Sequence, residues 1–125
     1  MGVISKDDCI TGYFLAWLSY DLELLRFVFA PDAKYIIENK DRVYEGHAEI
    51  EKYWIRNKNR QRDLSLSWTI EERTDEYVSV KFNAQFYDIE EAERNTIDGN
   101  GFFCFDKNNR ITVFREEYIK IITTQ

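Results

Sequence analysis

The chain has 125 residues, a length typical of one domain that can bury a substantial core. Its formal net charge of −6 argues against a nucleic-acid groove, and its 16% aromatic content can fill a core and also line a pocket. The locally basic run 52–62 is typical of a solvated helix face. We therefore expect a single domain over residues 1–125 and no nucleic-acid partner.

Cysteine and histidine usage restricts metal and redox chemistry. The two cysteines, Cys9 and Cys104, are far apart, and His47 is the single histidine. This set argues against a Cys/His zinc site, whereas a carboxylate-only metal site stays open. No apolar run approaches the roughly 18 residues of a bilayer-spanning helix, and the N-terminus has no signal-peptide pattern. We expect free thiols, no metal, no cofactor, no membrane partner and a cytoplasmic location.

Two helices are predicted near the N-terminus. Ser5 and Asp8 resemble a capping box, and apolar residues then follow helical spacing: Ile10, Tyr13, Phe14, Trp17 and Leu18. Asp21 can cap a second, short helix that we expect to end at Pro31. The apolar side of that helix carries Leu24, Leu25 and Val28.

A short hairpin and a third helix follow in the chain. Residues 33–37 favour a strand that turns at 39–41 and returns through Val43 and Tyr44. After Gly46, one helical face carries Ile50, Tyr53 and Trp54, and its continuation reaches Gln61. An apolar stripe that ends in an amide indicates a helix with one end over a polar space. Beyond Arg62 the period becomes two, which predicts a strand with Leu64, Leu66, Trp68 and Ile70 on its buried face.

Three more strands are predicted after this one. They cover residues 77–87, 96–105 and 111–121, with an acidic loop at 88–94 and a turn at 107–109. Residues 98–101, Asp-Gly-Asn-Gly, indicate either a turn or a strand with a glycine-marked bulge or close approach. Long antiparallel strands need cover on one face, and three early helices can supply it. The predicted fold is therefore α+β, a curved, mostly antiparallel sheet wrapped around helices as a cone with an inner pocket.

Four segments resemble the nuclear transport factor 2-like superfamily, specifically its SnoaL-like (polyketide cyclase-like) branch. They are FAPDAKY (29–35), YEGHAEIEKYW (44–54), RQRDLSLSW (60–68) and IDGNGFFCFDKNNRITVFREEY (97–118). The resemblance implies a single SnoaL-like domain with a cystatin-like cone, and a strand at 98–101. It implies no one function, because this superfamily includes isomerases, dehydratases, cyclases and non-enzymatic modules.

The resemblance also implies which side chains face the cone. Strand parity assigns to the inner face Ala33, Tyr35, Ile37, Gly101, Phe103, Phe105, Phe114, Glu116 and Tyr118. A bulge of one residue would reverse these assignments.

Comparison with the ketosteroid isomerases of this superfamily points to Tyr13 as a catalytic candidate. Tyr13 falls at the position of their first-helix tyrosine, but Ile37 replaces the general-base aspartate and Gly101 the neutral aspartic acid. Proton abstraction next to a carbonyl needs a base and an oxyanion donor, so steroid isomerisation is not expected. Glu38 could replace the base after a register slip, although its parity points outward.

Glu116 is the carboxylate that we expect to be catalytic. It lies between Phe114 and Tyr118 on an apolar face, where burial raises a carboxyl pKa into the range of acid–base catalysis. Alternatively it is structural, paired with Arg115 or Arg26 or hydrogen-bonded to Gln61. Asp98 is a second carboxylate candidate that turn chemistry explains equally well, and we expect His47 at the surface.

The predicted ligand-binding residues come from the same face and from helices one and three. They are Trp17, Tyr35, Ile37, Trp54, Gln61, Phe103, Phe114 and Tyr118. Trp17 and Trp54 are either pocket walls or core, and Gln61 is either a ligand contact or a helix-end cap. The expected partner is a small apolar or aromatic ligand.

Two functions stay open on this sequence. The first is a protein that binds a small molecule in a pocket. If it is also catalytic, it is a cofactor-independent acid–base enzyme (lyase, isomerase or cyclase) acting on an apolar ring compound. The second is a non-catalytic dimerisation or protein-interaction module. Under both, an apolar outer strand face predicts a homodimer, with Phe102, Cys104, Ile111, Val113 and Ile119 on that face.

Overall fold

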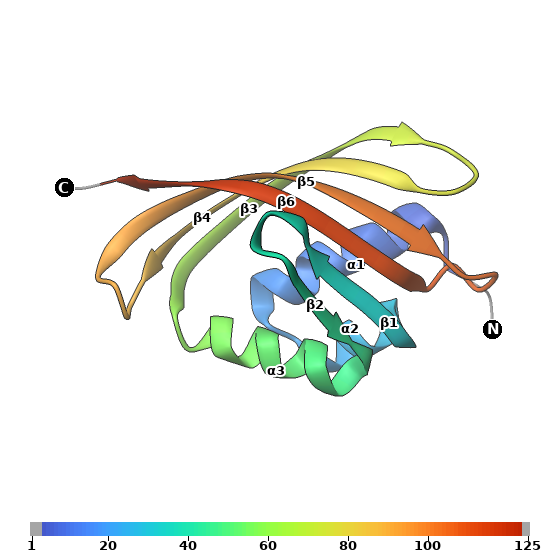
Figure 1. Ribbon diagram of the computed structural model, residues 1–125, viewed down its shortest axis with the longest axis horizontal. Coiled ribbons are helices and arrows are strands. Elements are labelled where there is room, and N and C mark those ends of the chain that lie inside the picture. The colour runs from blue at the N-terminus through green and yellow to red at the C-terminus, as the bar shows by residue number, and fades with distance from the viewer. Residues whose placement is uncertain (1–3, 124–125) are drawn as a thin grey trace.

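A computed structural model describes residues 4–123 and places three helices on one face of a six-stranded sheet (Figure 1). The helices are α1 (Lys6–Ser19), α2 (Leu22–Val28) and α3 (Gly46–Lys58), with a single 3₁₀ turn at Glu38–Lys40. The strands are β1 (Phe29–Ile37), β2 (Arg42–Glu45), β3 (Gln61–Arg73), β4 (Val78–Asp88), β5 (Glu93–Phe105) and β6 (Ile111–Thr123). Each predicted helix and strand is therefore present.

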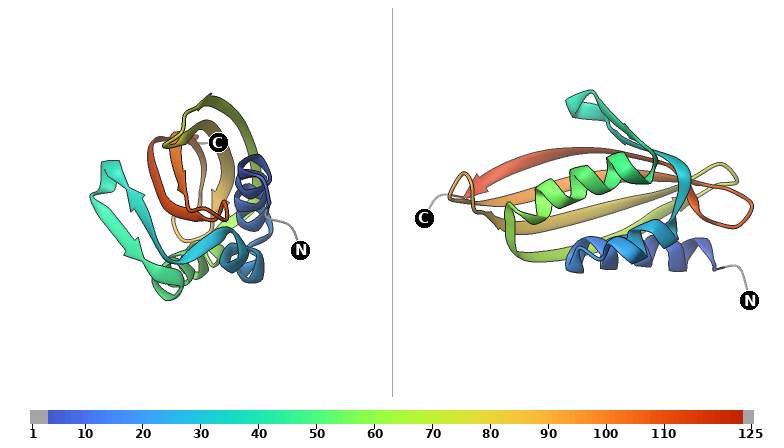
Figure 2. Two further views of the ribbon diagram at one scale, coloured as in Figure 1. Left: turned by 90° about the vertical axis from the view of Figure 1, so that its right-hand side faces the viewer. Right: turned by 90° about the horizontal axis from the view of Figure 1, so that it is seen from below.

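The sheet is open and runs in the order β2-β1-β6-β5-β4-β3. Neighbouring strands are antiparallel except for β1 and β6, which are parallel. Figure 2 shows the sheet curling around the helices, with α3 lying against β1 and α1 against α2. The predicted α+β class and the curved, mostly antiparallel sheet are confirmed.

Both predicted helix caps form at the N-terminal end. The Ser5 hydroxyl accepts from the Asp8 backbone N–H at 3.0 Å, and Asp21 accepts from two N–H groups at the start of α2. Two details of the prediction were wrong. Leu18 is 44% exposed, so it does not belong to the buried face of α1. The second helix ends at Val28, because the chain enters β1 before it reaches Pro31.

Residues 98–101 form a regular part of β5, and the turn interpretation was wrong. The pairing with β4 and β6 runs through them without a shift. Close approach of aromatic rings explains the glycines. A Cβ at Gly99 would lie 2.3 Å from the Phe82 ring, and one at Gly101 would lie 2.8 Å from the Phe114 ring. These strand positions therefore exclude larger residues because neighbouring rings fill the space.

The predicted inner face is largely confirmed by the register. Tyr35 lies opposite Phe114, and Glu116 has both Ile37 of β1 and Gly101 of β5 as neighbours. A register shift after Cys104 brings Ile111 opposite Phe105. Ile111 is consequently fully buried, and its prediction as an outer-face residue was wrong.

Two boundaries differ from the sequence-based expectation. Helix α3 ends at Lys58, so Gln61 is the first residue of β3 and does not continue the helix. The acidic loop is shorter than predicted, because β4 extends to Asp88 and β5 begins at Glu93. Both cysteines are free, and within residues 4–123 no helix is long and apolar enough to cross a membrane.

Candidate functional site

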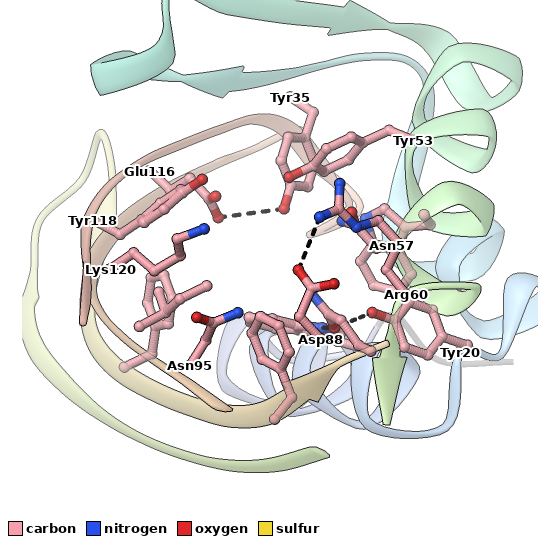
Figure 3. Close-up of a pocket in the computed structure, with 16 residues that line it drawn as sticks. Tyr20, Tyr35, Tyr53, Asn57, Arg60, Asp88, Asn95, Glu116, Tyr118 and Lys120 are labelled. Atoms are coloured by element: carbon pink, nitrogen blue, oxygen red, sulfur yellow. Dashed lines mark hydrogen bonds and ion pairs between the residues drawn. The ribbon is translucent and has the colours of Figure 1, made fainter. Parts of the chain in front are cut away.

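A cavity of about 170 Å³ lies between the inner face of the sheet and the helices α1 and α3 (Figure 3). Its apolar walls are rings of the first helix, third helix and β4, among them Trp17, Trp54, Phe82 and Phe86. Polar side chains from several elements also reach it: Asn57, Arg60, Gln61, Asp88, Asn95, Glu116 and Lys120. The wall is therefore more polar than the sequence-based analysis predicted.

Glu116 lies on the cavity wall and is nearly inaccessible to solvent. It is 6% exposed, and burial raises its pKa to about 8, although the hydrogen bond from Tyr35 acts in the opposite direction. The Tyr35 hydroxyl donates to Glu116 Oε1 at 3.3 Å. Because the pKa lies above 7, the carboxyl group is predominantly protonated at neutral pH.

The alternative structural partners of Glu116 are engaged elsewhere. Arg26 forms an ion pair with Glu51, and Arg115 lies 3.9 Å from Glu38. The Gln61 side-chain oxygen accepts from the Trp17 indole at 3.1 Å and from the Tyr20 hydroxyl. Glu116 consequently has no cationic partner among the described residues.

A chain of buried hydroxyl groups leads from Glu116 into the core. The hydroxyl groups of Tyr13 and Tyr35 lie 3.0 Å apart, and Tyr35 then donates to Glu116. Burial and the nearby Glu116 raise the pKa of both tyrosines well above the usual value. Both phenols therefore stay neutral and act as hydrogen-bond donors.

Four of the predicted site residues do not line the cavity. Tyr13, Ile37, Phe103 and Phe114 are all buried in the core beneath it. The Tyr13 ring packs against Phe103 and Phe114 with ring centroids 5.4 and 4.8 Å away. The two phenylalanines thus pack against Tyr13 and do not border the cavity, where direct contact with a ligand was expected of them. Tyr13 reaches Glu116 only through Tyr35.

The other predicted residues do come together at the cavity. Trp17, Trp54, Tyr35, Gln61, Tyr118 and Glu116 all line it. Gln61 is held by Trp17 and Tyr20 of the first helix region, so it links α1 to the start of β3. Gln61 is therefore not a helix-end cap, and because its side chain borders the cavity the ligand contact stays a prediction.

Asn95 is a site residue that the sequence-based analysis missed. It is 2% exposed, and neither its amide oxygen nor its amide nitrogen has a hydrogen-bond partner in residues 4–123. Leaving such a group unpaired costs about 1–3 kcal/mol, so a partner from outside the chain is expected. Its signal was strand parity, since Asn95 precedes Ile97, Gly99 and Gly101 at intervals of two. The predicted strand began one residue too late to include it.

An ion pair closes one end of the cavity. Arg60 Nη2 lies 2.9 Å from Asp88 Oδ2, and the backbone N–H groups of Glu90 and Glu91 donate to Asp88 Oδ1. Burial raises the pKa of Asp88, but the hydrogen bonds from Glu91 and Arg60 outweigh it, so that the pKa is lowered overall. Asp88 is therefore ionised and a weak base.

The remaining candidates from the sequence lie away from the cavity. Glu38 is exposed, and Asp98 accepts from Asn83 at 2.6 Å on the outer face of the sheet. The His47 ring forms a hydrogen bond with the Phe29 carbonyl at 2.9 Å and is half-buried, not fully at the surface as expected. The described part of the chain holds no group of three or more His, Cys, Asp or Glu suited to a metal ion.

No protein-family model matches the sequence, and no curated protein matches it significantly. Solved structures do match. A protein named as a SnoaL-like polyketide cyclase, from Shewanella denitrificans, superposes with a TM-score of 0.77 at 19% identity, covering 91% of this chain and 90% of its own. A nuclear transport factor 2-like protein from Burkholderia pseudomallei superposes with a TM-score of 0.77 at 15% identity, covering 93% and 92%. The protein has the nuclear transport factor 2-like fold.

An enzyme is also among the similar structures. SalBIII, an epoxide hydrolase/cyclase-like enzyme of pyran ring formation in the polyether salinomycin, superposes with a TM-score of 0.78 at 18% identity, covering 91% of this chain and 90% of its own. At such identities the similarity shows the nuclear transport factor 2-like fold only. The activity has to be inferred from the residues of this chain.

Within this nuclear transport factor 2-like fold, the arrangement can transfer a proton. A neutral carboxyl group, Glu116, faces a partly apolar cavity and is backed by the Tyr35 and Tyr13 hydroxyl groups. A polar amide and two cations border the same space. Such a site can bind a small molecule and give up or accept a proton at one of its oxygen or carbon atoms.

Proposed function

We propose that the protein binds a small apolar or aromatic molecule in this cavity and acts on it as a cofactor-independent lyase, isomerase or cyclase. The observation that carries the proposal is Glu116, a buried carboxyl group on the cavity wall with a pKa near 8 and no cationic partner in the described chain. A group of this kind is costly for stability, and groups with such pKa values are concentrated at active sites. The epoxide hydrolase/cyclase-like name of one similar structure supports acid–base chemistry.

The proton would move through Glu116 in two directions. Since Tyr35 donates to Oε1, the carboxyl proton is placed on Oε2 and can pass to a substrate oxygen. The resulting carboxylate keeps the Tyr35 hydrogen bond, which stabilises its charge, and Tyr13 in turn bonds Tyr35. The carboxylate then takes back a proton from a substrate carbon or from water, which restores the neutral acid.

Deuterium exchange into a panel of single-ring ketones, followed by NMR in D₂O, tests this proposal. We expect the wild-type protein to accelerate exchange next to the carbonyl group, and Glu116→Gln to lose about 100-fold of that rate. The matched control is Glu117→Gln, the same change at the exposed neighbouring position, which should keep the full rate. No acceleration by the wild type, or an equal rate in Glu116→Gln, would contradict the proposal.

A second candidate function is self-association, with the outer sheet face as a homodimer interface. The observation that favours it is Ile119, which is 63% exposed on β6. Ile121 follows two residues later on the same strand face and is 48% exposed. This role is compatible with catalysis, because the cavity lies on the opposite face of the sheet.

A further inference from the structure

The charges around the cavity do not balance. Among the residues that line the cavity, Arg60 is paired with Asp88, and it also lies 3.8 Å from the exposed Glu90, which is outside the lining. Glu116 is uncharged at neutral pH because burial raises its pKa. Lys120 also borders the cavity, and it forms no ion pair with any residue from 4 to 123. The phenols of Tyr35 and Tyr53 are neutral as well, since burial raises the pKa of both. The residues that line the cavity therefore carry one excess positive charge, that of the solvent-exposed Lys120, in a protein whose net charge is −6.

Lys120 and Asn95 are close neighbours on the inner face of the sheet. Lys120 of β6 lies directly opposite Ile97 of β5, and Asn95 precedes Ile97 by two residues. Such diagonal neighbours have Cα atoms roughly 7–8 Å apart. Figure 3 shows the Asn95 amide and the Lys120 side chain extending into the same space. A single anionic group can thus contact the Lys120 ammonium and the unpaired Asn95 amide together.

The volume limits the size of the molecule that can be bound. The cavity measures about 170 Å³, close to the roughly 150 Å³ of an engineered protein cavity that binds benzene. One six-membered ring with a small substituent fits this space, and a fused four-ring compound does not. Trp17 and Trp54 supply apolar walls for such a ring.

We propose that the ligand of this cavity is a single-ring carboxylate, with its ring against Trp17 and Trp54 and its carboxylate held by Lys120 and the Asn95 amide nitrogen. One excess positive charge matches one carboxylate, whereas a phosphate at pH 7 would bring nearly two negative charges against a single lysine. A cationic ligand would be repelled by Lys120. This assignment rests on the proposed small-molecule-binding function and names its substrate class.

Binding of the carboxylate should depend on pH. Glu116 lies on the same strand face as Lys120 and lines the same cavity, so its ionisation near pH 8 adds a second negative charge to the cavity that holds the ligand carboxylate. Arg60 and Asp88 keep their charges throughout this range, because their pairing raises the pKa of Arg60 and contributes to lowering that of Asp88. Carboxylate affinity should therefore fall above about pH 8 in the wild-type protein, and this fall should be absent in Glu116→Gln.

Titration with benzoate and with its neutral isostere benzamide tests the proposal, with the fluorescence of the cavity tryptophans as the signal. At pH 7 we expect benzoate to bind about tenfold or more tightly than benzamide. Lys120→Gln should remove this preference, Lys120→Arg should retain most of it, and Glu116→Gln should still bind benzoate. The matched control is Lys81→Gln, an exposed lysine on β4 outside the cavity lining, which should leave both affinities unchanged.

Several outcomes would overturn the assignment. They are equal affinity for benzoate and benzamide, retention of the preference in Lys120→Gln, or no binding of benzoate at millimolar concentration. Each of these can occur while Glu116-dependent deuterium exchange persists, in which case the substrate class is wrong and the acid–base function stands. If no Glu116-dependent exchange is found but benzoate binds selectively, the acid–base function is wrong and the carboxylate site stands.

Discussion

Glu116 shows how one side chain can couple stability to chemistry. A carboxylate loses its hydration when it is buried, and here the only compensation in the described structure is one hydrogen bond from Tyr35. The group responds by keeping its proton at neutral pH, as its raised pKa indicates. The same burial that makes it a useful acid must therefore lower the stability of the folded protein at high pH.

This coupling gives a prediction for the stability of the wild-type protein and of Glu116→Gln. The folded-state pKa of about 8 lies above the ordinary 4.5, so the stability contributed by the neutral acid is complete below about pH 4.5 and is lost as pH rises to about 8. Glutamine is neutral at every pH and keeps an oxygen that can accept from Tyr35. Across this pH interval we expect the free energy of unfolding of Glu116→Gln to rise relative to that of the wild type by up to about 5 kcal/mol.

Urea unfolding of both proteins at a series of pH values measures this difference. The comparison isolates Glu116, because all other titrating groups are common to the two proteins. Glu117→Gln serves as the control, and its difference from the wild type should stay nearly constant with pH, since Glu117 is exposed. A constant difference between Glu116→Gln and the wild type would show that Glu116 is ionised in the folded state.

The two most informative site residues differ in how far the sequence could predict them. Glu116 could be predicted as an inward-facing residue, because Phe114 and Tyr118 flank it at intervals of two on a long strand. Asn95 could not be predicted in this way. It follows the acidic stretch that separates two strands, and the end of a strand is set by pairing with its neighbours. Its meaning also depends on the absence of a partner, which only the packed structure reveals.

At the scale of single elements, β5 shows why a turn-like sequence can form a strand. Asp98, Gly99, Asn100 and Gly101 have poor strand propensity, yet the strand pairs on both sides throughout. The two glycines face inward, where the rings of Phe82 and Phe114 occupy the space that side chains would need. Tertiary packing has thus replaced local propensity as the determinant of this element.

Gly99→Ala should therefore destabilise the protein even though alanine favours a strand no less than glycine. The new Cβ would lie 2.3 Å from the Phe82 ring, which must move. Overpacking of this kind costs about 1–3 kcal/mol. Urea unfolding should show this loss, whereas Asn100→Ala on the opposite face should change the free energy of unfolding much less. Equal stability of Gly99→Ala and the wild type would mean that the ring relocates freely.

Helix positions were more predictable than the ends of the strands. Ser5 and Asp21 are local signals, because each cap accepts hydrogen bonds from residues within three positions. The boundary between α3 and β3 was misjudged at Gln61, since its side chain satisfies Trp17 and Tyr20, more than forty positions away. Contacts between residues so far apart in the sequence do not change the local hydrophobic periodicity, so they cannot be predicted from it.

At the scale of the whole molecule, the placement of all three helices on one side leaves the other face of the sheet uncovered (Figure 1). The centre of that face combines exposed Ile119 with side chains of both charge signs on β4, β5 and β6, namely Lys81, Asp98, Arg115 and Glu117. A two-fold dimer requires a surface that is complementary to itself. A mixture of opposite charges around an apolar centre meets this requirement, so we propose a second copy of the chain as the occupant.

Sedimentation velocity of the wild-type protein and of Ile119→Lys tests this arrangement. We expect a dimer for the wild type and a monomer for the variant, because the interface would have to bury the new ammonium group without a partner. Ile55→Lys is the control, since Ile55 is 43% exposed on α3, away from the sheet face, and it should leave the dimer intact. The cavity lies between the inner face of the sheet and the helices, on the side opposite Ile119, so benzoate should still quench the tryptophan fluorescence of monomeric Ile119→Lys. A monomeric wild type, or a dimer that survives Ile119→Lys, would contradict the assignment of this face.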